Sequence, residues 1–399
     1  MSDVAVLGLT HMQWLLLGLA AAVGTLAGWS AVMLLLHPVR PAGIPGLVPI
    51  QGYVSAHGNG MATFAIEQLL ADFPSPRRFF EQLGPDRFRR EFSRALKERL
   101  DEHVEDVMTR RNGRSWEALS SYARDRIYAH VHRRLPYVID DFVDHVQRDL
   151  DDIVHPAVLV RRHFTLHPER VAQAFMDSFG ADLRAALPVG MLAALAAALP
   201  VVLLFDGPWA WAITGGLSAV TASLVVLYLL SRPVERGGIW PLQMQGILHR
   251  HRQRFVQQLV VQVVNDALGW RSVVGEFLRG AHAGRVRHMM RREVASILDV
   301  PVFRTSMQLL LGPEGFAEVK SSAVEKAVEM LASAPVSVSL REHYRVELTR
   351  TLGHAAARVP ATAYEALWEP VLERAWRYVP LLTGVGGLLL GAAFGRLLF

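Results

Sequence analysis

An acidic run that also contains histidine is the clearest candidate for chemistry in the sequence. It covers residues 140–152 and is followed by His155. On a helix, side chains four residues apart share a face, so several carboxylates and an imidazole can converge on a divalent cation. The run lies beside an apolar face, however, and a solvated surface with ion pairs explains it equally well. A metal-dependent enzyme is therefore the least favoured of three functional hypotheses, the other two of which are given below. Its candidate ligands are Asp141, His145, Asp149 and Asp152.

A basic run, 249–254, follows the third apolar stretch of the chain. Anionic lipid headgroups favour each Lys or Arg near a membrane surface by about 1 kcal/mol. The run therefore indicates either contact with lipid headgroups or residues that set the topology, and both readings stay open. Because no base-reading module accompanies the arginines, no nucleic-acid partner is expected. The candidate headgroup or juxtamembrane residues are Arg40, Arg232, Arg236, His249, Arg250, His251, Arg252 and Arg254.

Common catalytic motifs are missing from the sequence. It has no phosphate-binding Gly-x-x-x-x-Gly-Lys-Ser/Thr loop, no Gly-x-Ser-x-Gly elbow and no His-Glu-x-x-His run. The chain contains 0 cysteines, which excludes a disulfide scaffold, a thiolate zinc site, an iron–sulfur cluster and a cysteine nucleophile. We therefore expect no catalytic residue and no cofactor.

Four stretches of the chain lack charged side chains, and they predict the helices that position the residues above. The chain has 399 residues, of which 51% are hydrophobic, and its mean hydropathy is +0.22. Each stretch is long enough to cross a hydrocarbon core of about 30 Å. Trp and Tyr residues at their ends suit the headgroup region. The predicted spans are 14–36, 185–205, 209–230 and 379–395.

The order of the spans predicts the topology. The second and third are separated only by Asp206, Gly207 and Pro208, so the polar segments 37–183 and 232–378 lie on one side of the membrane. Arginines flank the spans on that side, whereas residues 1–13 contain no Lys or Arg. Since Lys and Arg are retained in the cytoplasm, we expect a bacterial inner-membrane protein with cytoplasmic polar segments and periplasmic termini.

Small residues recur in the spans at four-residue spacing, a pattern that lets helices approach closely. No ionisable residue lies within these stretches, which disfavours coupling of transport to a buried charge. The predicted packing residues are Gly24, Gly28, Gly387, Gly391 and Gly395.

The two polar segments have the same length and begin with similar residues, which indicates an internal duplication. The predicted repeats are 1–206 and 207–399, each with a span, a Pro/Gly-containing loop, a helical region and a second span. The matching loop residues are Pro38, Gly43, Gln51 and Gly52 in the first repeat and Pro233, Gly238, Gln245 and Gly246 in the second.

Four short motifs make the repeated unit resemble the bacterial membrane family called domain of unknown function 445. They are 34–38, 246–252, 181–184 and 384–395, and the resemblance covers nearly the whole chain, twice. A Thr-Asn pair of the family has no counterpart, since Ala27-Gly28 and Ala222-Ser223 stand at about those places. The resemblance implies the architecture and adds no chemistry.

Apolar residues at helical spacing predict that the polar segments are all-α. Prolines at 74, 76, 136, 156, 313 and 360 divide them into several amphipathic helices. The predicted fold is thus an all-α membrane protein with four transmembrane helices and two homologous helical cytoplasmic lobes. The clearest stripes are Ile139, Phe142, Val143, Val146, Leu150 and Ile153; Phe88, Phe92, Leu96, Leu100 and Val104; and Phe255, Leu259, Val263 and Leu268.

These observations favour a non-catalytic inner-membrane protein, a membrane-anchored scaffold or lipid-associated module. The alternative is a carrier of lipid or another apolar ligand, which an apolar channel among the helices would favour and a closed bundle would disfavour. The expected partners are anionic membrane lipids, together with a second copy of the chain or an envelope protein.

Overall fold

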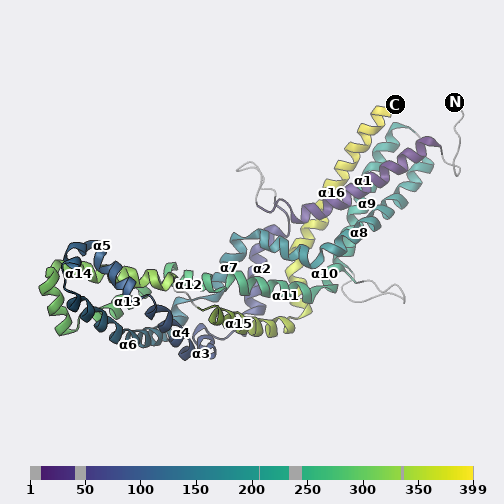
Figure 1. The fold of residues 1–399 in the computed structure, drawn as a ribbon. Helices are drawn as coiled ribbons and strands as arrows, with labels where there is room; N and C mark the ends of the chain where they lie inside the picture. Colours follow the sequence, from purple (N-terminus) through teal and green to yellow (C-terminus); the bar gives the residue numbers. More distant parts are fainter. Residues whose placement is uncertain (1–9, 41–50, 206, 233–244, 334–336, 399) are drawn as a thin grey trace. The chain divides into compact units, whose positions relative to one another are not determined.

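The computed structural model describes residues 10–40, 51–205, 207–232, 245–333 and 337–398 (Figure 1). Every regular element in these ranges is helical, which confirms the all-α prediction. The chain divides into two compact units. The first unit consists of residues 1–69, 161–262 and 354–399, and the second of residues 70–160 and 263–353.

The first unit contains the four long apolar helices that were predicted as spans. All four are long and apolar enough to cross a membrane, and they lie side by side (Figure 1). A fifth candidate span would arise in the second unit if the two helices 283–298 and 301–330, which are bent by 87°, were counted as one. The four helices are α1 (His11–Leu36), α8 (Pro168–Leu204), α9 (Pro208–Ser231) and α16 (Ala361–Leu398).

Local sequence explains where these helices begin and turn. Thr10 caps α1, because its hydroxyl accepts from the Gln13 amide while the Gln13 side chain accepts from the Thr10 amide. The turn from α8 to α9 passes through Gly207, whose φ of 109° favours glycine. Pro208 then starts α9, where its missing N–H costs nothing. The second and third apolar helices therefore end and begin close together along the chain, as predicted, and Asp206 between them lies outside the described residues.

Glycines lie where α9 and α16 approach most closely. A Cβ on Gly387 would clash with the carbonyl oxygen of Gly215, and one on Gly391 with that of Trp211. Gly395 lies against Pro208 and Trp211. A hydrogen bond of 3.0 Å from the Thr383 hydroxyl to that of Ser223 joins the same two helices.

The other two predicted packing glycines lie on α1. A Cβ on Gly24 would meet Ala194 of α8, and one on Gly28 would be in ordinary contact with Leu187 and Val226. Small residues thus bring the backbones of the four-helix bundle together, as dispersion packing between helices in a membrane requires.

An aromatic cluster fills the part of the first unit next to the bundle. Trp368 is 2% exposed and packs against Phe175, Phe255 and Tyr364 at ring-centroid distances of 5.5, 5.1 and 6.2 Å. The hydroxyl of Tyr364 donates to the carbonyl oxygen of Leu248 at 3.1 Å. Short elements complete this layer: η1 (Ser55–His57), α2 (Gly58–Phe64), η2 (Ala65–Leu69), α10 (Ile247–Arg250) and α11 (Arg252–Gln262).

The second unit is built from segments of both polar regions of the sequence. From the first region come α3 (Pro76–Leu83), α4 (Pro85–Lys97), α5 (Leu100–Glu117) and α6 (Ser121–Ile153). From the second come η3 (Val263–Ala267), α12 (Trp270–Arg279), α13 (Ala283–Leu298) and α14 (Pro301–Ser333). Two further helices, α7 (Pro156–Leu166) and α15 (Val338–Arg358), contribute residues to both units.

The predicted break at Pro136 is wrong, because α6 continues through it as one helix of 33 residues. Proline removes one helical hydrogen bond, and the apolar face that α6 buries, including Leu135 and Ile139, outweighs that loss. At Pro313, another of the predicted breaks, α14 does change direction, since Gly312 has a φ of 77°.

The structure does not confirm the prediction of two cytoplasmic lobes, one from each polar segment. Each polar segment contributes to both compact units, and the second unit combines residues 70–160 with residues 263–353. Sequence repeats need not fold separately, because the apolar stripe of one copy can be buried against that of the other. The duplication itself, with boundaries at 206 and 207, stays a prediction.

Candidate functional site

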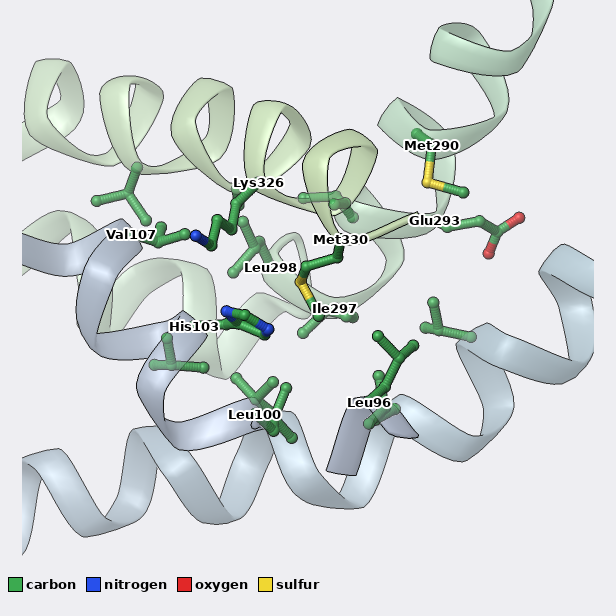
Figure 2. Close-up of a pocket in the computed structure, with 18 of the residues that line it drawn as sticks. Leu96, Leu100, His103, Val107, Met290, Glu293, Ile297, Leu298, Lys326 and Met330 are labelled. Carbon is green, nitrogen blue, oxygen red and sulfur yellow. The ribbon is translucent and has the colours of Figure 1, made fainter. Parts of the chain in front are cut away.

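The second unit contains an apolar cavity of about 170 Å³ that is partly open to the surface. Helices α4, α5, α6, α13 and α14 form its wall (Figure 2). All of the lining residues are apolar except His103, Glu293 and Lys326. Well-packed interiors contain few voids larger than a water molecule, so a hollow of this size is a specific feature of the fold.

Two of the polar lining residues lie together at one end of the cavity, His103 and Lys326 (Figure 2). The ammonium of Lys326 lies 2.6 Å from a carboxylate oxygen of Asp106 and 3.4 Å from one of Glu329. The hydrogen bond to Asp106 raises the pKa of Lys326 and lowers that of Asp106. Arg110 also contacts both carboxylates, at 3.2 and 3.3 Å, so the four charges balance. This end of the cavity is therefore polar and has no net charge.

Glu293 lies at the opposite end, and its side chain is only 8% exposed (Figure 2). Its carboxylate is 3.4 Å from Nδ1 of His145 on α6. Burial raises the pKa of Glu293, and the nearby His145 opposes that shift without cancelling it. Glu293 thus links α13 to α6 beside the apolar wall.

Replacing this buried carboxyl predicts a specific change in pH dependence. Because the folded pKa of Glu293 is raised, its ionisation destabilises the fold as pH rises from its ordinary value of 4.5 through the folded value. Glu293→Gln should therefore lose less stability than the wild type over that pH range. Thermal unfolding of the full chain in detergent at several pH values measures this, and parallel curves for the two proteins would contradict the assignment.

A second apolar cavity of about 150 Å³ lies in the same unit. It is lined by α3, α4, α6 and α12, together with Leu340 and Tyr344 of α15. The hydroxyl of Tyr344 is occupied, because it donates to the carbonyl oxygen of Leu268 at 2.7 Å. None of the described residues that line it carries a charge.

Comparisons with known proteins do not add to this geometry. No family model, curated protein or solved structure matches the chain. The resemblance to domain of unknown function 445 therefore stays an expectation, and the site has to be interpreted from its own residues.

The candidate metal ligands on α6 do not gather around one point. Nδ1 of His145 lies 2.7 Å from the backbone carbonyl oxygen of Asp141, and Asp152 pairs with Arg285 at 2.9 Å. Asp149 is half-buried on the same helix. Within the described ranges, no group of three or more His, Asp or Glu side chains is placed to hold a metal ion.

The predicted basic residues separate into two kinds. His249 packs against Tyr364, and burial lowers the pKa of His249, while His251 pairs with Asp182 at 2.6 Å. The histidines are thus part of the packing of the first unit. Arg252 is half-buried, and Arg236 lies outside the described residues. The exposed members of the set are Arg40, Arg232, Arg250 and Arg254.

Among the loop residues of the two predicted repeats, one matched pair of glycines makes equivalent contacts in the structure. Gly52 packs against the backbone at the end of α1, and Gly246 packs against the backbone at the end of α9. The Gln51 side chain donates to the carbonyl oxygen of Val39 at 2.8 Å. Pro38 and Gln245 are half-buried. The remaining members, Gly43, Pro233 and Gly238, lie outside the described residues.

Sequence reasoning missed both cavities, although it identified part of their walls. The stripes through Phe92 and Phe142 were interpreted as packing faces, and both residues line the hollows. The only available signal was the presence of His103 and Lys326 beside apolar stripes. Such a pattern does not show whether the helices pack tightly against one another or leave a cavity between them.

Proposed function

We propose that the protein is a membrane-anchored module that binds an apolar chain of a lipid or similar amphiphile in its second unit. The cavity of about 170 Å³ carries this proposal, since its wall is apolar apart from three side chains. Four helices able to cross a membrane support it, because they keep the unit close to a source of such ligands.

The energetics of the cavity favour an occupant. Apolar surface that stays in contact with water carries an unfavourable free energy of about 25 cal/mol per Å². An apolar ligand that covers the lining of this cavity removes that cost, so the site favours binding of hydrocarbon.

Replacing Ala327 with Phe should abolish binding, because the new ring fills the cavity from α14. The test uses the full chain in lipid vesicles with a photoactivatable dodecanoate, and identifies labelled peptides by mass spectrometry. The wild type should be labelled on α5, α6, α13 and α14. Ala327→Phe should lose at least about nine-tenths of that labelling, as expected when about 1.4 kcal/mol or more of binding free energy is lost.

Ala317→Phe is the matched control, since Ala317 lies on the exposed face of the same helix and does not line the cavity. It should be labelled like the wild type. Equal labelling of the wild type and of Ala327→Phe would reject ligand binding and favour the second candidate, a non-catalytic scaffold whose exposed Arg250 and Arg254 contact anionic headgroups.

We further propose that the protein lies in a bacterial inner membrane with both polar segments in the cytoplasm. The exposed Arg40 and Arg232, at the ends of α1 and α9, support this orientation. Reporters fused after Ser120 and after Val300 should both give a cytoplasmic signal. A periplasmic signal from either fusion would contradict the proposed topology.

A further inference from the structure

The two cavities of the second unit lie end to end along α6. On this helix the first cavity is lined by residues between Ile127 and Phe142, and the second by residues between Phe142 and Leu150. Phe92 of α4 also lines both. The rings of Phe92 and Phe142 are stacked with centroids 6.4 Å apart. Among the residues that the structure describes, this pair of side chains alone belongs to both walls.

Neither cavity alone matches the size of a membrane acyl chain. An apolar cavity of about 150 Å³ holds a guest the size of benzene, and these two measure about 170 and 150 Å³. A single acyl chain reaches across one leaflet, or about half of the 30 Å hydrocarbon core. An elongated guest therefore needs both hollows, whereas a compact guest needs only one.

Two of the three polar lining residues of the first cavity lie together at one end of it, and the third, Glu293, lies at the other end (Figure 2). His103 and Lys326 lie at the end of the first cavity away from Glu293 (Figure 2). Asp106, Arg110 and Glu329 surround the Lys326 ammonium and are partly exposed, so this end reaches the surface. The second cavity has no charged lining residue.

From this arrangement we propose that the two cavities form one channel for a single linear acyl chain, with Phe92 and Phe142 as a movable partition. The polar end of the ligand lies near His103 and Lys326, and the methyl end lies in the second cavity. This inference rests on the proposed function and narrows it, because it assigns a long chain as the ligand in place of a compact apolar molecule.

The test compares hexanoate, dodecanoate and hexadecanoate as competitors of the photoactivatable dodecanoate, with the full chain in vesicles. Each buried methylene contributes about 0.8 kcal/mol, so dodecanoate should compete at least about tenfold better than hexanoate after correction for partition into the lipid. Val146→Trp fills the second cavity alone and should remove this advantage while hexanoate still competes. Val302→Trp, at a side chain that is 79% exposed, is the control.

A second measurement does not depend on any variant. A probe with its reactive group next to the carboxylate should label α5 and α14, and one with the group at the methyl end should label Val146, Leu150 or Val274. Identical labelling by the two probes, or no gain with chain length, would overturn the channel. If Ala327→Phe still abolished labelling in that case, the proposed function would stand with a compact ligand; if it did not, both proposals would fail.

Discussion

Gly387→Ala should destabilise the four-helix bundle by about 1–3 kcal/mol, because the added methyl group overpacks the contact between α16 and α9. The new Cβ would clash with the carbonyl oxygen of Gly215 and would also meet the side chain of Ala219. Backbone atoms cannot rotate away as a flexible side chain can, so the two helices have to separate.

Gly386→Ala is the matched control, since no heavy atom lies within 4 Å of a Cβ at that position. Both substitutions bring the same gain in helix propensity, so their difference isolates the interhelical contact. Thermal unfolding of the full chain in detergent should show a lower midpoint for Gly387→Ala only. Equal midpoints would mean that α9 and α16 do not approach through this face.

Trp368→Ala should cost about 3–5 kcal/mol, the usual range for removing a large aromatic side chain from a core. Trp368 is 2% exposed and lies among four aromatic rings, those of Phe175, Phe179, Phe255 and Tyr364. These rings come from α8, α11 and α16, so the loss should loosen the layer next to the bundle.

Trp209→Ala provides the comparison, because Trp209 is 80% exposed at the start of α9. Its removal should change the free energy of unfolding by about 0.5 kcal/mol or less in detergent. The measurement is chemical unfolding followed by near-ultraviolet circular dichroism. A similar loss for both variants would show that burial of Trp368 does not stabilise the first unit.

Several features followed from sequence alone because they depend on short stretches of chain. The four apolar helices were predicted from length and hydropathy, and all four occur where they were expected. Helix starts at Pro76 and Pro156 follow from proline, which is tolerated at a first helical position. Pro136 was the exception, since α6 buries enough apolar surface to continue through it.

Other features required the tertiary structure, because they depend on which surfaces meet. Apolar stripes through Phe92 and Phe142 predict a buried face, but the same stripe can line a filled interface or a hollow. Similarly, Gly386 and Gly387 are neighbouring glycines, and the sequence does not show which of them faces another helix. The placement of α9 against Gly387 shows which one it is.

The all-α fold and the four helices able to cross a membrane could be predicted from the amino-acid sequence, since both properties arise from the periodicity and length of local segments. The combination of residues 70–160 and 263–353 in one unit, with apolar space inside it, became apparent from the three-dimensional structure. Packing between distant segments depends on the shapes of many side chains at once, and no single stretch of sequence contains that information.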